Sequence, residues 1–441
     1  MSLIVSNIKA ISLLGLPIVV GQLGVVLQGM ADTIMVGRYG TAELGASALV
    51  NNIYNFAIFF LLGISYATTP VIGGAYGRGD NDGVARSLRE SLVVNLFFSL
   101  LLMALLTILY FRIELLRQPS GLMPLVRPYY LVLMFSLPFL AGFNALKQFV
   151  EAVGVTSLPM EAMIAGNVMN IVLNAVFIYG LFGMPELGLL GAGIATLLSR
   201  VFLFAVMAAA MLRDHRFSPW LTSCNTTVSC AGCARMTRIG LPISLQLCLE
   251  SASFNVAGIF MGWTGSVSLA AHQVMCSIAT LIFMIHYGVG AAAAIRISHF
   301  RGRGEWGAVR DTVRTAWGIS ALIALLLVSV ICIFRHSVTS VFTSDPVVRS
   351  VCYSLLPAFV LYQLGDCTQI IFANSLRAIE AVGRMVLYAL VAYVFVSIPM
   401  SYFLGIFLGY GAQGIWYGIP FGLSVAAMLF IYEFKRNTIC K

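Results

Sequence analysis

Long apolar segments recur along the whole chain and constrain its fold more than any other feature. A helix needs about 20 mostly apolar residues to cross a bilayer, and inside lipid it must satisfy its own backbone hydrogen bonds. Segments of alternating polarity, which indicate a membrane β-barrel, are absent. We predict an all-α polytopic membrane protein with twelve transmembrane helices, at 10–36, 44–72, 88–111, 128–151, 158–180, 187–212, 237–262, 267–297, 312–334, 349–377, 383–407 and 411–434.

The composition excludes several soluble classes. Of the 441 residues, 60% are hydrophobic and 10% are charged, whereas soluble domains carry about 25% charged residues. A disordered chain, a collagen and a coiled coil are therefore ruled out. The net charge of +9 does not indicate nucleic-acid binding, because the basic residues lie in short loops between the apolar segments.

Those loop cations predict the orientation of the chain. An inside N-terminus places 18 Lys and Arg residues in inner segments and 6 in outer segments, in agreement with the positive-inside rule. We therefore expect both termini in the cytoplasm and the protein in the cell (inner) membrane. The first apolar segment is too long for a signal sequence and lacks a small-residue cleavage site, so we expect it to be retained.

The second half of the chain repeats the first. A shift of 225 residues aligns GLPI at 15–18 with GLPI at 240–243, and it also pairs Gly63 with Gly288. The same shift pairs Gly180 with Gly405, although small gaps are needed near Asp366. Matched glycine and proline positions are not explained by a shared excess of apolar residues.

This repeat predicts two pseudo-symmetric six-helix lobes. The lobes are expected at 1–212 and at 237–441, the latter with a cytoplasmic tail, and the cytoplasmic loop 213–236 connects them. Each half holds an even number of spans, so the repeats are parallel, as in several secondary transporters with a central site. The arrangement favours a transporter that works by alternating access.

Three acidic residues lie inside predicted spans, where a charge costs at least about 2.5–3.5 kcal/mol on insertion scales. Glu250 and Asp366 each lie midway along a span, and Asp32 lies nearer the outer end of the first span. The repeat pairs Asp32 with Ala257 and Glu250 with Val25. Acids that break the pseudo-symmetry are poorly explained as scaffold.

A carboxylate kept out of water can exchange a proton near neutral pH, and carboxylate oxygens also suit a hard monovalent cation such as Na⁺. Asn170 and Asn174 share one helix face, and Thr196 adds a hydroxyl in the next span. Tyr362, one turn before Asp366, gives the second half an acid–phenol face. Phe and Met side chains around such acids would suit a lipophilic cation.

These residues also have structural interpretations. Glu250 and Asp366 could form buried hydrogen bonds to neighbouring helices, and so could the asparagines. Asp32 could instead be an interfacial acid near Arg38, six residues further on.

Other ionisable groups are less informative. Lys147 and Glu151 have the spacing of an i, i+4 ion pair, and Arg200 needs an acidic partner that the sequence does not identify. His272 and His286 could move protons, although satisfied core histidines explain them as well.

The connecting loop carries three cysteines. Cys230 and Cys233 form a CxxC, but without a second CxxC or an HxxxH a zinc site with Cys224 is not expected. Asn225 begins a glycosylation sequon, which the predicted cytoplasmic side makes irrelevant.

With these residues in place, the chain resembles the multidrug and toxic compound extrusion (MATE) family, and within it the bacterial NorM type. The resemblance covers nearly the whole chain, and the order and spacing of its motifs make it specific. The motifs are ADTIMVG at 31–37, NIVLNAVFIYG at 170–180, GLPISLQLCLES at 240–251, AAHQV at 270–274, YQLGDCTQ at 362–369 and NSLR at 374–377.

The resemblance implies the fold of the MATE family within the MOP superfamily, and a monomeric antiporter in the lipid bilayer. Such an antiporter expels organic cations and amphipathic drugs while Na⁺ or H⁺ enters, and it needs no other cofactor. The matched first-lobe residues are Asp32, Asn170, Asn174 and Thr196, and the matched second-lobe cation site is Glu250, Asp366 and Tyr362. Related DinF-type members lack the second-lobe acid pair, so its presence favours the NorM type and sodium coupling.

Other functions fit the sequence less well. A lipid-linked oligosaccharide flippase of the same broad fold superfamily should have a basic cavity for pyrophosphate, whereas the intramembrane charges here lean acidic. An enzyme is not expected, because there is no HExxH, no cluster of His ligands and no serine–histidine arrangement. A channel is equally disfavoured, and no nucleotide-binding P-loop is present. The substrate range and the choice between Na⁺ and H⁺ stay open.

Overall fold

The computed structural model describes residues 2–113, 120–222 and 227–439. Within these ranges there is no strand, and twelve helices are long and apolar enough to cross a membrane. The predicted all-α fold with twelve transmembrane helices is therefore confirmed. Most helices extend beyond the predicted spans, because hydropathy detects the lipid-exposed stretch of a helix rather than its ends.

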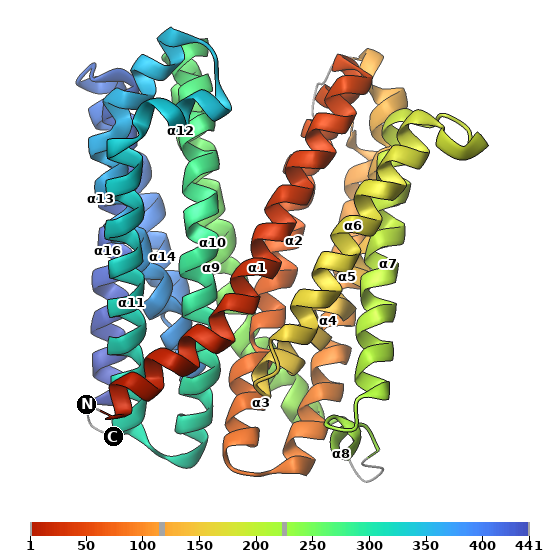
Figure 1. The fold of residues 1–441 in the computed structure, drawn as a ribbon, viewed down its shortest axis with the longest axis vertical. Coiled ribbons are helices and arrows are strands. Elements are labelled where there is room, and N and C mark those ends of the chain that lie inside the picture. The colour runs from red at the N-terminus through yellow and green to blue at the C-terminus, as the bar shows by residue number, and fades with distance from the viewer. Residues whose placement is uncertain (1, 114–119, 223–226, 440–441) are drawn as a thin grey trace. The chain divides into compact units, whose positions relative to one another are not determined.

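The first six spans are formed by seven helices (Figure 1). They are α1 (Ser2–Tyr39), α2 (Thr41–Tyr66) with its continuation α3 (Thr68–Gly77), α4 (Asn81–Phe111), α5 (Met123–Ala152), α6 (Ser157–Tyr179) and α7 (Gly188–Arg213). Short elements lie in the connections: η2 (Ser120–Leu122), η3 (Leu181–Gly183) and α8 (Ser218–Leu221).

The last six spans begin at α9. They are α9 (Cys230–Trp263), α10 (Ser266–Arg303), α11 (Trp306–Ile333), α13 (Pro346–Ala378), a segment of four short elements, and α16 (Gly411–Thr438). The four short elements are α14 (Met385–Ala389), η4 (Leu390–Ser397), α15 (Ile398–Tyr402) and η5 (Phe403–Phe407), of which η4 and η5 are π-helical. The short helix α12 (Arg335–Phe342) precedes α13.

The chain forms two compact units. The first unit is Val20–Ser244, and the second combines Met1–Val19 with Leu245–Lys441. Each of the long helices α1 and α9 therefore contributes to both units. The lobes predicted from the sequence, at 1–212 and 237–441, stay a prediction. The sequence did not indicate that α1 and α9 each contribute to both units.

The sequence repeat corresponds to a repeated packing contact. In the first unit a Cβ atom on Gly63 would collide with the backbone of Ser244, whose hydroxyl donates to the Phe60 carbonyl at 2.7 Å. In the second unit a Cβ atom on Gly288 would collide with Val19. Both contact pairs are related by the shift of 225 residues, so the matched glycines are needed for close helix approach.

One predicted repeat pair is not structurally equivalent. Gly180 directly follows α6 and has a positive φ of 70°, which favours glycine at a helix end. Gly405 instead lies inside η5, where a Cβ atom would collide with Ile415. Gly409, with φ of 75°, ends this span in place of Gly405. The repeat therefore requires a gap here.

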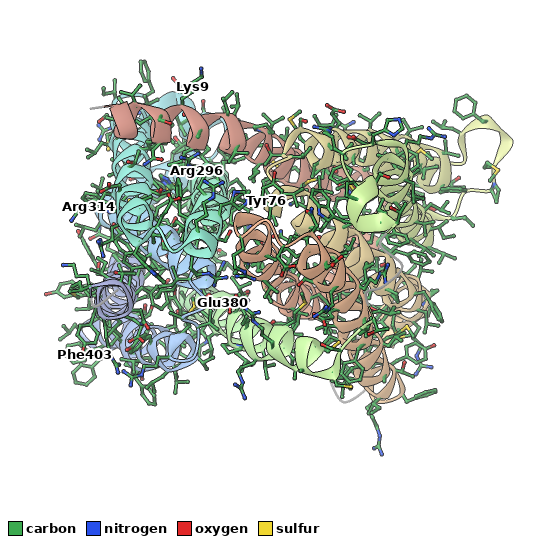
Figure 2. All side chains as sticks on the ribbon, turned by 90° about the horizontal axis from the view of Figure 1, so that it is seen from below. Lys9, Tyr76, Arg296, Arg314, Glu380 and Phe403 are labelled. Carbon is green, nitrogen blue, oxygen red and sulfur yellow. The ribbon has the colours of Figure 1, made fainter. Side chains whose placement is uncertain are left out.

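The beginning of α1 and the end of α16 lie at the same end of the second unit (Figure 1). Arg310 donates to the Thr438 carbonyl near the end of α16 at 2.7 Å. Arg296 donates to Asn7 in the first turns of α1 at 2.7 Å, and Figure 2 shows Arg296 beside this part of α1. An even number of spans per half requires this arrangement.

Candidate functional site

A polar cluster lies inside the second unit, around the two acids predicted for it. Asp366 on α13 is 1% exposed, and its Oδ2 atom has no hydrogen-bond partner. Glu250 on α9 is partly buried and interacts electrostatically with Asp366. The structure thus brings together two carboxylates from helices that are far apart in sequence.

Glu250 is held by side chains that the sequence analysis did not identify. Gln246, one turn earlier on α9, donates from Nε2 to Glu250 Oε2 at 2.7 Å. Gln369 on α13 donates to the same oxygen at 3.4 Å and to the Tyr393 hydroxyl at 3.1 Å. Tyr393 is a further hydrogen-bond partner of Glu250. The i, i+4 spacing of Gln246 and Glu250 was the available signal.

Tyr393 comes from the π-helical element η4. Such elements are rare and often lie at functional sites. This span packs closely against α16 at three glycines of α16, where an added Cβ atom would collide with the span. The colliding pairs are Gly414 with Leu404, Gly418 with Ser401, and Gly422 with Ser397. This close packing fixes the face that carries Tyr393 toward α9 and α13.

Arg377 is one of the 18 Lys and Arg residues that the sequence assigns to the inner segments, at the end of the span predicted at 349–377. The structure places its side chain inside the second unit. It is 6% exposed, and its Nη2 atom donates to Gln246 Oε1 at 2.7 Å. It also interacts electrostatically with Glu250. The long side chain turns back from the end of α13 into the cluster, which the position of Arg377 in the sequence could not reveal.

Tyr362 lies where the sequence predicted it, one turn before Asp366 on α13. It is buried, and it interacts electrostatically with Asp366 and Glu250. Three aromatic rings surround it, with centroids at 6.0 Å for Phe254, 5.9 Å for Phe359 and 6.3 Å for Trp416. The acids therefore lie beside an aromatic cluster, which we define as Phe254, Phe359, Tyr362 and Trp416.

The first unit contains a second, separate polar cluster. Asn174 donates from Nδ2 to Asp32 Oδ1 at 2.5 Å and to Asn170 Oδ1 at 3.0 Å. Both asparagines are fully buried, and Asn170 Nδ2 and Asn174 Oδ1 have no hydrogen-bond partner. The structure therefore joins Asp32, Asn170 and Asn174 as the sequence predicted.

Arg200 on α7 belongs to this cluster. It interacts electrostatically with Asp32, and its Nη1 atom donates to Ser136 Oγ at 2.6 Å. Asp32 is thus the acidic partner that the sequence left open. Asp32 faces Asn174 and Arg200, which replaces the interpretation of Asp32 as an acid beside Arg38.

Thr196 is less closely connected to Asp32 than the sequence analysis expected. It lies one turn before Arg200 on α7, and its hydroxyl donates to the Ala192 carbonyl of the same helix at 3.0 Å. A hydroxyl bonded in this way satisfies itself locally. Thr196 therefore lies on the same face of α7 as Arg200, but its hydroxyl is bonded within its own helix and not to Asp32.

The remaining ionisable groups contact their immediate neighbours. Lys147 and Glu151 form the predicted i, i+4 ion pair at 3.8 Å, with both side chains buried. His286 is fully buried, and its Nδ1 atom lies 2.8 Å from the Ser320 hydroxyl. His272 contacts Cys276 and the ring of Trp416.

No metal centre was found in the part of the chain that the structure describes: no group of three or more His, Cys, Asp or Glu side chains could hold a metal ion there. Cys230 and Cys233 form no disulfide. The third loop cysteine, Cys224, and the start of the sequon at Asn225 lie outside the described residues.

Comparison with known proteins places this arrangement in one family. The MatE family model matches residues 17–176 and 242–403, so each half of the chain matches it once. The chain is 31% identical over 433 residues to the probable multidrug resistance protein NorM of Bradyrhizobium diazoefficiens, covering 96% of this chain and 92% of the relative. It is 29% identical over 439 residues to the multidrug resistance protein MdtK of Pectobacterium atrosepticum, covering 97% and 95%.

Solved structures share the fold. An outward-facing multidrug resistance MATE family transporter of the MOP superfamily has a TM-score of 0.89 at 22% identity, with 98% of this chain and 96% of that chain covered. The eukaryotic MATE transporter AtDTX14 has a TM-score of 0.86 at 21% identity, with the same coverage. The repeat, the twelve spans and these matches agree: the chain is a multi-pass membrane protein that belongs to the MatE family.

Proposed function

We propose that this protein is a cation-coupled efflux transporter, which expels organic cations and other amphipathic drugs while Na⁺ or H⁺ moves inward. Relatives named as multidrug resistance proteins support the substrate class. We place the protein in the cell (inner) membrane as a monomer with both termini in the cytoplasm, as the loop cations suggest. No separate cofactor enters this proposal.

The observation that carries the proposal is the acid pair inside the second unit, with Asp366 buried and Glu250 partly buried. An ionised carboxylate inside a membrane protein is expensive unless a partner compensates it, and Asp366 Oδ2 has no hydrogen-bond partner. A proton or a small cation on that oxygen removes the cost. We assign Glu250 and Asp366 as the groups that exchange the coupling cation. The hydroxyl of Tyr362 supplies a neighbouring oxygen.

The first unit supplies a second exchangeable group in this proposal. Asp32 accepts a hydrogen bond from Asn174, and its negative charge interacts with the positive charge of Arg200. In this proposal the Asp32 carboxylate exchanges these partners during the transport cycle. Asn170 and Asn174 each retain a buried polar atom without a partner, which a bound ligand can satisfy. Thr196 lies on the same helix as Arg200 and contributes less directly.

The aromatic cluster beside Glu250 and Asp366 suits the organic-cation class. Aromatic faces attract organic cations with about 0.5–2 kcal/mol each, depending on how dry the contact is. A cationic drug and the coupling cation then favour different states of the transporter. Because a ligand shifts states only through its different affinities for them, neither ligand alone completes the cycle.

The flippase alternative requires cationic groups that are available to a pyrophosphate. Two arginines do lie in the polar clusters, but Arg377 donates to Gln246, which is itself bonded to Glu250, and Arg200 donates to Ser136 and interacts electrostatically with Asp32. Each positive charge therefore interacts with an acid of the same cluster, which favours a cationic substrate.

Ethidium efflux from membrane vesicles, with sodium and proton gradients imposed separately, tests the proposal. We expect one of the two gradients to drive efflux in the wild type, and Glu250→Gln to abolish that acceleration. If neither gradient drives efflux of any cationic dye, the protein is not a cation-coupled drug antiporter.

A further inference from the structure

A buried arginine is linked by hydrogen bonds, through one glutamine, to an acid of the second unit. We call Glu250 and Asp366 the acid cluster of this unit. Arg377 Nη2 donates to Gln246 Oε1 at 2.7 Å, and Gln246 Nε2 donates to Glu250 Oε2 at 2.7 Å. Gln246 is fully buried and uses both ends of its amide in this bridge. The guanidinium is therefore held one side chain away from the carboxylate instead of touching it.

Three charged groups determine the electrostatics of this cluster. Glu250 interacts with Arg377 and with Asp366. An arginine keeps its charge at every accessible pH, whereas phenols and thiols are neutral near pH 7. The phenols and the thiol that interact with the two acids or with each other are those of Tyr362, Tyr393 and Cys276. The imidazole of His272 contacts Cys276 and neither acid.

We propose that Arg377 is the resident counterion of the acid cluster, so that the cluster carries one net negative charge and binds one exchangeable monovalent cation. Two carboxylates and one guanidinium leave a single uncompensated charge. This inference rests on the proposed function, because it concerns the cation that Glu250 and Asp366 exchange. It adds the number of cations and the residue that sets it.

The geometry of the bridge suits a counterion that does not block the site. Gln246 and Gln369 both donate to Oε2 of Glu250, so neither amide occupies Oε1. Asp366 Oδ2 also has no hydrogen-bond partner. A direct arginine–carboxylate contact would instead engage both oxygens of the acid in a bidentate pair. The glutamine bridge lowers the net charge and leaves Asp366 Oδ2, which has no hydrogen-bond partner, for a ligand.

A purely structural role for Arg377 makes a different prediction. A cation in the last turn of α13 also stabilises the helix end, and losing that contact would lower stability without changing cation binding. The number and affinity of bound cations therefore separate the two roles.

Cation counting on the purified full-length protein in lipid nanodiscs tests the proposal. Binding of radioactive sodium and release of protons are measured together near neutral pH for the wild type, Arg377→Gln and Arg377→Lys. The wild type and Arg377→Lys should each bind one monovalent cation per chain. Arg377→Gln should bind a second cation, or bind the first about tenfold more tightly or more, because a nearby positive charge is gone.

A matched control keeps the comparison specific. Arg296 is another arginine of the second unit, and it donates to Asn7 rather than to the acid cluster. Arg296→Gln should therefore bind one cation with wild-type affinity. An equal change in Arg296→Gln and Arg377→Gln would mean that any lost arginine alters binding, which contradicts a specific counterion.

A charge-balanced pair of variants tests the inference if Arg377→Gln inserts poorly. Glu250→Gln leaves Asp366 and Arg377 with no net charge and should bind no cation. Glu250→Gln combined with Arg377→Gln restores one negative charge and should restore one cation. No restoration in an inserted double variant would overturn the proposal.

The outcomes for Arg377 and for the proposed function can be told apart. If a cation gradient drives wild-type efflux but Arg377→Gln binds cations as the wild type does, only the counterion role fails. If the wild type binds no cation and no gradient drives efflux, the proposed function fails and the inference fails with it.

Discussion

Asp366 illustrates, at the scale of single residues, why we propose a function for a buried acid. A buried polar atom without a partner costs about 1–3 kcal/mol, so a scaffold residue with an orphaned oxygen would be a net loss of stability. Asp366 Oδ2 is such an atom. The loss is understandable if a proton or a small cation occupies that oxygen during the cycle.

Replacing Asp366 by Asn keeps its volume and removes its charge. We expect gradient-driven ethidium efflux to fall at least about tenfold, because an amide cannot exchange a proton or compensate a cation. Protein in the membrane should stay near the wild-type amount. Asp311→Asn is the matched control, since Asp311 is an exposed acid of the same unit, and efflux by this variant should be unchanged. Equal losses in both variants would contradict a specific role for Asp366.

The acids were predictable from the sequence, whereas their partners were not. A carboxylate in an apolar span stands out by its transfer cost, so Asp32, Glu250 and Asp366 could be selected. Hydropathy gives the depth of a residue in the membrane but not the direction of a long side chain. Arg377 therefore looked like a loop cation, and Gln246 had no signal beyond its spacing from Glu250.

At the scale of helices, the segment Met385–Phe407 differs from the other spans. Its two π-helical elements have wider turns than an α-helix, and η4 carries Tyr393 into contact with Gln369 and Glu250. Nothing in the apolar sequence of this span distinguishes a π-turn from an α-turn, so the sequence analysis predicted the span but not the position of Tyr393.

Removing one residue from η4 tests whether the wide turn positions Tyr393. Deletion of Leu390 moves Tyr393 by one residue along the helix and therefore turns it to a different face relative to the start of the span, so its hydroxyl should leave Gln369 and Glu250. We expect coupled efflux to fall at least as far as in Tyr393→Phe, while Leu390→Ala keeps the register and the activity. Wild-type efflux by the deletion variant would show that η4 does not orient the site.

The matched glycines Gly63 and Gly288 predict a graded effect on stability. A Cβ atom on Gly63 would meet the backbone of Ser244, whereas one on Gly288 would first meet the side chain of Val19. Backbone cannot move aside as a side chain can. Gly63→Ala should therefore lower the melting temperature of the purified protein more than Gly288→Ala does. The reverse order would contradict the packing described for the two units.

At the scale of the whole molecule, the two repeated units carry different polar clusters. The repeat in the sequence predicted a duplicated fold, and the MatE model matches each half once. The acids are not duplicated, since Asp32 pairs with Ala257 and Glu250 with Val25 in the alignment of the halves. We therefore propose that cation exchange takes place chiefly in the second unit, and that Asp32 is the exchangeable group of the first unit.

The central claim is that cation entry and drug exit are one coupled process. In vesicles containing the purified protein, the most direct measurement follows sodium with a radioactive tracer, protons with an interior pH dye, and ethidium in the same preparation. We expect ethidium to accelerate the movement of one of the two cations in the wild type and in neither Glu250→Gln nor Asp366→Asn. Ethidium movement that neither changes nor depends on either cation flux would contradict it.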